Sequence, residues 1–140
     1  MPMSQTPLAV TAYTATSALG HGLAGHFYAL AQGRSGLRPN DISSAPLACW
    51  IGRVDGVGTA ALPAELADWD CRNNRLAWLG LQQDGFIDQV RRARARYGAA
   101  RIALLLGTST ASIGATEEAY RRLDAEGGMP DDLLRPAIHA

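Results

Sequence analysis

A long amphipathic stripe constrains the fold of this chain more than any other sequence feature. Mostly apolar residues recur every three or four positions over 72–97, which predicts one helix that begins after Asp70 and ends at Gly98. The segment 101–106 follows at once, with apolar residues at successive positions, as in a parallel strand buried on both faces. A long helix joined to a buried strand is typical of an α/β fold. The stripe consists of Leu76, Leu79, Gln83, Phe86, Val90, Ala93 and Tyr97.

The shorter elements fit the same fold class. They are a strand over 8–13, a helix over 24–32 that stops at Gly33, a loop over 33–46, a strand over 49–54 and a helix over 116–123. This order of strands and helices predicts a mostly parallel sheet with packed helices. We expect residues 124–140 to form a poorly ordered tail.

Composition excludes several classes of function. Thirteen basic residues balance thirteen acidic ones, so the net charge favours neither nucleic acid nor an anionic membrane as a partner. Every basic residue is Arg, and without Lys this segment cannot form a Schiff base. No apolar run approaches the roughly 20 residues of a membrane span, and no signal peptide is recognisable. We therefore expect a cytoplasmic location.

The cysteines and histidines do not form a recognisable metal or redox motif. Cys49 and Cys71 are too far apart for a CxxC pair, so each is either a reactive thiol or a small packing residue, and the sequence favours packing. His21 and His26 are five residues apart and diverge on a helix, while His139 lies at the far end. We predict no metal site.

The segment 20–25 reads Gly-His-Gly-Leu-Ala-Gly, a literal GxGxxG between a predicted strand and a helix. This pattern raises a Rossmann-type NAD(P) domain as a minor alternative. Two details oppose it. Six residues separate Tyr13 from Gly20, where the motif should follow its strand directly. No acidic residue ends the second strand, because Asp41 lies in a loop and Asp55 is 35 residues beyond Gly20.

Four local patterns together resemble the amino-terminal part of the β-ketoacyl-acyl-carrier-protein synthases, in the same order and over nearly the whole chain. They are Ser17-Ala18-Leu19-Gly20, Gly33-Arg34-Ser35-Gly36, the helix entry from Asp70 to Arg75, and a buried strand followed by Gly107-Thr108, Gly114 and Glu117-Glu118. The resemblance implies a thiolase-like fold, in which two similar α/β halves pack together. Residues 1–140 would be an incomplete part of the first half.

The resemblance also implies a reaction. Enzymes of this family take an acyl group from acyl carrier protein onto a Cys, decarboxylate a malonyl thioester and join the resulting carbanion to the acyl group. The catalytic Cys and His residues of the family lie beyond position 140, so we predict no catalytic residue in this segment and no cofactor. Acyl carrier protein carrying acyl or malonyl groups is the implied partner, and the parent protein is expected to be a homodimer or heterodimer. A non-catalytic partner subunit similar to a chain-length factor remains an alternative.

One position of the family's acyl pocket carries over by resemblance. The third residue after the Gly that ends the third strand acts as a gate on this pocket, and here it is Thr110. Its neighbours Ser109 and Ala111, with Ser112, replace glycines of the family's turn. The added bulk and polarity favour a polyene, aryl or other specialised acyl chain over a straight saturated one.

Overall fold

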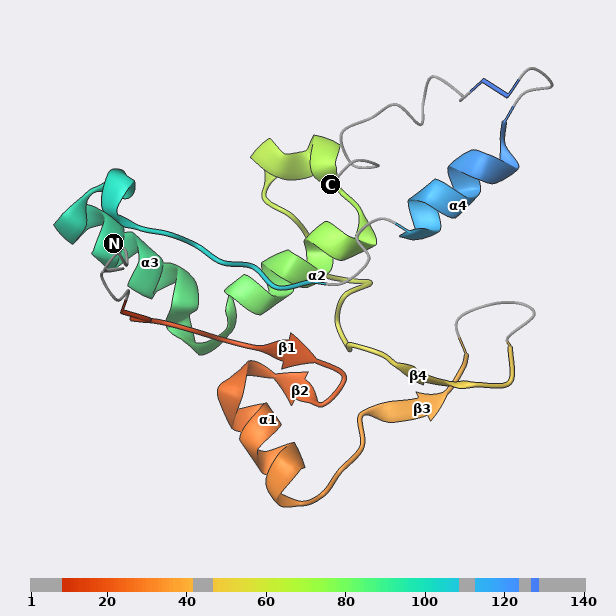
Figure 1. Ribbon diagram of the computed structural model, residues 1–140, viewed down its shortest axis with the longest axis horizontal. Helices are drawn as coiled ribbons and strands as arrows, with labels where there is room; N and C mark the ends of the chain where they lie inside the picture. Colours follow the sequence, from red (N-terminus) through yellow and green to blue (C-terminus); the bar gives the residue numbers. More distant parts are fainter. Residues whose placement is uncertain (1–8, 42–46, 109–112, 124–126, 129–140) are drawn as a thin grey trace, which may run out of the picture.

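Most of the regular secondary structure is helical (Figure 1). The computed structural model describes residues 9–41, 47–108, 113–123 and 127–128. The α-helices are α1 (Gly22–Ala31), α2 (Arg72–Leu81), α3 (Phe86–Tyr97) and α4 (Ile113–Arg121), and the short 3₁₀ helices are η1 (Ala64–Trp69), η2 (Gln83–Gly85) and η3 (Ala99–Arg101). The strands are β1 (Thr16–Ser17), β2 (Gly20–His21), β3 (Leu37–Pro39) and β4 (Trp50–Gly52).

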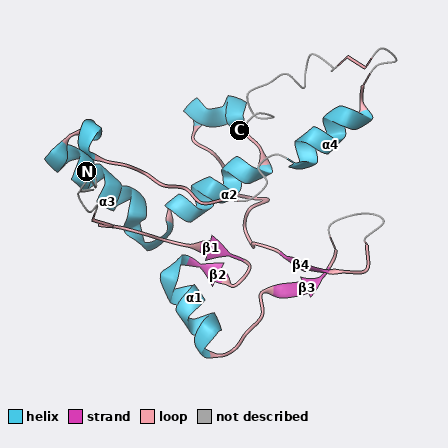
Figure 2. Cartoon of the chain, in the orientation of Figure 1, coloured by secondary structure: helices cyan, strands magenta, loops and turns pink. Residues whose placement is uncertain are grey.

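The strands form two small antiparallel sheets (Figure 2). β1 pairs with β2 through the register Ser17 to Gly20, and β3 pairs with β4 through Arg38 to Ile51. The mixed α/β class predicted from the sequence is confirmed. The predicted strand over 49–54 is present only as β4, and its partner β3 lies in a segment predicted to be loop.

The mostly parallel sheet is not found in the described part of the chain, and that prediction is wrong there. Residues 9–13 and 102–108 are not assigned as strands and form no ladder with any described segment. In Figure 1 both run from the side of α3 towards the middle of the molecule. A buried parallel strand needs hydrogen-bonded neighbours and covered faces. Among the described residues, neither segment has a hydrogen-bonded neighbouring strand, and the faces are open: Leu105 is 87% exposed.

The single helix predicted over 72–97 is also wrong, because the chain breaks between α2 and α3. Asp84 and Gly85 adopt positive φ angles of 53° and 64°, which no α-helix accommodates. The predicted first residue, Arg72, is confirmed, but the N-cap is Cys71 and not the predicted Asp70, and Cys71 makes no side-chain cap bond. The predicted end at Gly98 is confirmed as the C-cap, with a φ of 81°.

The break places Asp84 at the amino terminus of α1. One oxygen of its carboxylate accepts a hydrogen bond from the Leu23 N–H at 3.0 Å and from the Thr14 hydroxyl at 2.7 Å. The N-cap residue of α1, His21, makes no side-chain cap bond of its own. A carboxylate 61 residues further along the chain therefore caps α1 and complements its dipole.

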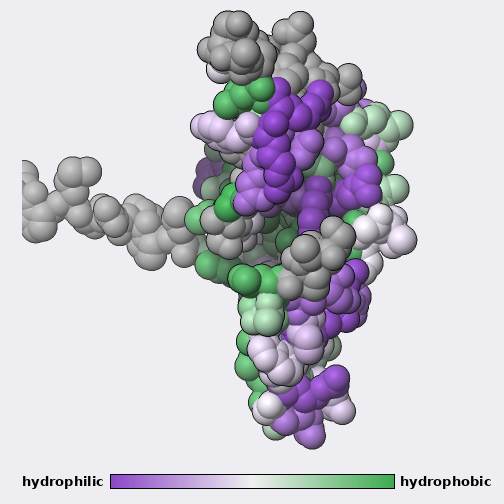
Figure 3. Space-filling model, turned by 90° about the vertical axis from the view of Figure 1, so that its right-hand side faces the viewer, coloured by the Kyte–Doolittle hydropathy of each residue, from purple (hydrophilic) through white to green (hydrophobic). Residues whose placement is uncertain are grey.

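The apolar core is small, and much apolar surface is open. The buried apolar residues of the described segments are Ala29, Val57, Phe86 and Ala119. Exposed large apolar residues include Val10, Phe27, Tyr28, Leu30, Leu104, Leu105 and Leu106. Figure 3, which views the molecule from the right-hand side of Figure 1, shows green apolar residues at the surface beside purple polar ones. Among the described helices, none is long and apolar enough to cross a membrane.

Candidate functional site

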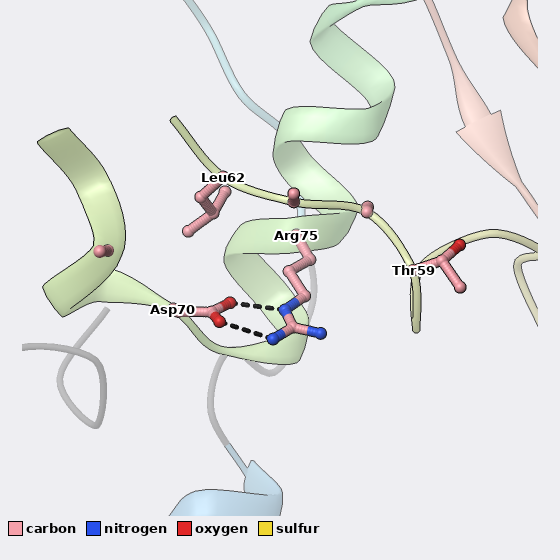
Figure 4. A pocket seen from close by; sticks show the side chains of 7 residues that line it. Thr59, Leu62, Asp70 and Arg75 are labelled. Atoms are coloured by element: carbon pink, nitrogen blue, oxygen red, sulfur yellow. Dashed lines mark hydrogen bonds and ion pairs between the residues drawn. The ribbon is translucent and has the colours of Figure 1, made fainter. Parts of the chain in front are cut away.

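A pocket of about 250 Å³ opens at the entry to α2 (Figure 4). Its walls come from the loop before η1, from η1 itself and from the first turn of α2. The lining residues are Thr59, Ala60, Ala61, Leu62, Ala67, Asp70 and Arg75. Small and apolar side chains therefore surround a single pair of opposite charges.

The two charged residues of this pocket bind each other. Arg75 donates from Nε and Nη2 to the two carboxylate oxygens of Asp70, each at 2.5 Å, and from Nη1 to the Gly58 carbonyl at 3.2 Å. The hydrogen bonds between the two side chains hold the pKa of Asp70 below its ordinary value and raise the pKa of Arg75. All three guanidinium nitrogens are thus engaged. The pocket offers a neutral or apolar group a place to bind, but no uncompensated charge for an anion.

The Asp70–Arg75 pair predicts an acid-sensitive junction between η1 and α2. Because the pKa of Asp70 is lower in the folded state, the pair contributes its full stability above the ordinary value of 3.8, and this contribution is lost as the pH falls through the lowered value. Tryptophan fluorescence during urea unfolding, with Trp69 next to the pair, measures the loss between pH 6 and pH 3. In Asp70→Asn, the profile of unfolding free energy against pH should be flatter over this range. Asp68→Asn, at an exposed position of η1, should leave it unchanged, and equal profiles for all three proteins would contradict the prediction.

Arg75 also lines a smaller pocket of about 170 Å³. It is lined by Val57, Gly58, Cys71, Arg72 and Arg75. Cys71 and Cys49 are both half-buried free thiols. Neither sulfur has a hydrogen-bond partner among the described residues, which fits the packing role that the sequence favours.

A hydrogen-bond network between β1 and α1 could not be predicted from the sequence. The Nδ1 of His26 donates to the Gly22 carbonyl at 2.7 Å, so in the neutral ring Nε2 accepts from the Ser17 hydroxyl at 2.8 Å. Ser17 Oγ in turn accepts from the Leu19 N–H at 3.1 Å. Ser17 and His26 are nine positions apart in the sequence, and the β1–β2 hairpin brings them together. In the part of the chain that the structure describes, no carboxylate joins this network, and its hydrogen bonds connect the β1–β2 turn to α1.

His21 and His26, the two histidines among the described residues, are not arranged as metal ligands. The Nε2 of His21 donates to the Asp55 carbonyl at 3.0 Å, away from the bonds of His26. Within residues 9–41, 47–108, 113–123 and 127–128, no three His, Cys, Asp or Glu side chains gather into a group that could hold an ion.

The predicted acyl-pocket residues Ser109, Thr110 and Ala111 lie outside the described residues. The segment that leads to them ends at Thr108, whose hydroxyl is 3.4 Å from the amide oxygen of Asn73. Asn73 belongs to the first turn of α2. The end of the apolar segment 102–108 therefore lies at the same helix entry as both pockets.

The glycine-rich segment 20–25 builds the turn from β2 into α1. Gly20 and Gly22 adopt φ angles of 151° and 69°, which residues with a side chain rarely adopt, and a Cβ on Gly22 would lie 2.9 Å from Oδ1 of Asp84. The helix amino terminus, where a dinucleotide pyrophosphate would bind, is already occupied by the carboxylate of Asp84. A phosphate would meet this negative charge, so the geometry argues against the NAD(P) alternative.

The function has to be argued from the chain's own residues. Comparisons with family models, with curated proteins and with solved structures give no match. Those residues provide three features: the backbone geometry and close contacts of the motif glycines, the charged pair at the entry to α2, and the apolar segments that have no strand partner among the described residues.

Proposed function

We propose that this chain is the amino-terminal segment of a β-ketoacyl-acyl-carrier-protein synthase and is inactive alone. The parent enzyme would transfer an acyl group from the carrier thioester to a Cys and release the carrier thiol. A malonyl thioester would then lose CO₂, and its carbanion would attack the acyl carbonyl and displace the Cys thiolate. In this proposal the present segment supplies packing elements and part of an acyl pocket.

The observation that carries the proposal is the contact between two of the motifs behind the resemblance. Gly36 ends the Gly-Arg-Ser-Gly motif, and Ala18 lies in the Ser-Ala-Leu-Gly turn. A Cβ on Gly36 would be 2.5 Å from the Ala18 carbonyl carbon and 2.6 Å from its oxygen. Gly36 is therefore required by a close backbone approach, and the two motifs form one packing unit.

The third motif gives further support. Asp70 and Arg75 are the acid and the last arginine of the helix-entry pattern, and they form the bidentate pair described above. A bidentate Arg–carboxylate pair fixes both side chains and their backbones in one geometry. The pair thus explains why this helix entry combines an acid and an arginine five positions apart.

The exposed apolar segments also support an incomplete fold. Val10 and Tyr13 are 82% and 61% exposed, and Leu105 in the segment 102–108 is 87% exposed. Exposed apolar segments of this size commonly mark a surface that another polypeptide covers. We infer that 9–13 and 102–108 become strands when further parts of the parent protein pair with them.

The activity is tested by comparing the full-length parent with the 140-residue chain. Both are incubated with acyl and malonyl groups on acyl carrier protein, and the 3-oxoacyl product is measured. We expect product from the parent and none from the chain alone. A parent that takes up no acyl group but activates a second subunit would support the chain-length-factor alternative instead. A thermal shift of the chain with NAD(P), without any condensation by the parent, would contradict the proposal.

The departures from glycine at 109–112 predict the acyl specificity of the parent. Ser109, Ala111 and Ser112 add bulk and polarity beside the proposed gate residue Thr110, so a specialised unsaturated acyl chain should be preferred over the matched saturated one by about tenfold in kcat/KM. Rates with carrier-bound chains of equal length measure this preference. Thr110→Gly should reduce it, and a strong preference for saturated chains would refute the prediction.

A further inference from the structure

The apolar stripe of the sequence continues across the break between α2 and α3. Gln83 and Phe86 are three residues apart, and the steps before and after them alternate between four and three. One unbroken helix over 72–97 would therefore keep all these residues on one face. The hydrophobic pattern encodes a continuous helix, whereas the structure holds a broken one.

The broken form has its own set of side-chain bonds. The amides of Gln82 and Gln83 donate to the Trp78 and Leu79 carbonyls at 3.2 and 2.8 Å, near the end of α2. The amide of Gln89 donates to the Asp84 carbonyl at 3.2 Å. Carbonyls at a helix end need partners, and these three glutamines provide them. In the broken form, these three backbone carbonyls therefore have hydrogen-bond donors.

The contacts of Asp84 connect the break to α1. The left-handed backbone of Asp84 is unfavourable for a residue with a side chain. Two hydrogen bonds to its carboxylate offset this cost. They come from the Leu23 N–H and the Thr14 hydroxyl, and both donors belong to the amino-terminal part of the chain. These hydrogen bonds exist only while the amino terminus of α1 stays beside Asp84.

We propose that residues 82–86 are a conformational switch that α1 controls through Asp84. When the amino terminus of α1 is docked on Asp84, α2 and α3 are separate helices. When α1 moves away, Asp84 returns to helical geometry and residues 72–97 join into one helix of about 39 Å. A partner that displaces α1 or the segment 9–15 would thereby reorient α3.

Hydrogen exchange of the 140-residue chain, read by mass spectrometry at peptide resolution, tests the switch. Asp84→Ala removes the cap, and Gly85→Ala favours the continuous helix without touching the carboxylate. In both variants the amides of 82–86 should gain about tenfold protection, while those of 22–25 lose protection. Asp84→Asn keeps an acceptor oxygen and should give an intermediate result. Asp88→Ala, which removes the 3.1 Å pair with Arg91 on α3, is the matched control and should change neither region.

Gly85→Ala is the decisive variant, because it leaves the Asp84 side chain and its partners intact. The switch requires protection to rise at 82–86 and to fall at 22–25 in this variant. Loss of protection at 82–86 in Gly85→Ala would mean that the break is a fixed turn, and would overturn the proposal. The same holds if 82–86 gains protection and 22–25 is unaffected, because α1 would then be uncoupled from the helix. A variant that does not fold shows loss of protection in both regions and also counts against the switch.

Discussion

Gly36→Ala should destabilise the β1–β2 turn and the segment leading into β3 by about 2–3 kcal/mol. The new Cβ would lie 2.5 Å from the carbonyl carbon of Ala18, so the two backbones have to separate. Limited thermolysin digestion of the 140-residue chain measures the effect as a cleavage rate within 34–52. The rate should rise about 30-fold, the factor that corresponds to a loss of about 2 kcal/mol.

Gly58→Ala is the matched control for this substitution. Gly58 has no heavy atom within 4 Å of a built Cβ, its φ lies outside the left-handed region, and alanine keeps the carbonyl that Arg75 binds. Its cleavage rate should stay close to that of the unchanged chain. Equal rates for the two variants would show that the motif containing Gly36 does not pack on the turn containing Ala18.

Phe86→Ala should have the second large effect, a loss of about 3 kcal/mol in the stability of the α2–α3 region. Phe86 is 8% exposed and is the largest of the four buried apolar side chains of the described segments. Its removal leaves a cavity in a core with few other contributors. Hydrogen exchange of the amides in α3 measures this loss.

Phe27→Ala removes the same side chain from an exposed position and serves as the control. Phe27 is 68% exposed on α1, so the chain studied alone should lose well under 1 kcal/mol. A cost for Phe27→Ala as large as that of Phe86→Ala would mean that the core lies elsewhere.

Local signals in the sequence predicted several elements correctly. The helix end at Gly98 and the stop at Gly33 follow from glycines with positive φ, a property that belongs to the residue itself. The helix predicted over 24–32 appears as α1, and that over 116–123 appears as α4, each with shifted bounds. The acid and arginine at the entry to α2 were visible as a motif, although Asp70 was expected to cap the helix and instead binds Arg75.

The features that sequence reasoning missed depend on contacts between distant residues. The break in the long helix requires Asp84 to meet Leu23 and Thr14, which are 61 and 70 positions away. The pairing of β3 with β4 and the bond from Ser17 to His26 also arise only after the chain folds back. Periodicity describes one segment at a time, so it predicted an unbroken helix and could not assign strand partners.

The unpaired segments link the fold to the proposed function. Residues 9–13 and 102–108 have the composition of buried strands and no strand partner in the described structure. Such segments offer free backbone groups and apolar side chains to other chains. If they are strands of an incomplete thiolase-like sheet, the chain studied alone should associate through them.

Sedimentation velocity of the 140-residue chain over a hundredfold range of concentration tests this claim most directly. We expect the average sedimentation coefficient to rise with concentration, because exposed apolar segments such as 102–108 bind one another. A single monomeric species at every concentration, with a sharp and reversible unfolding transition, would show a self-sufficient domain and contradict the account.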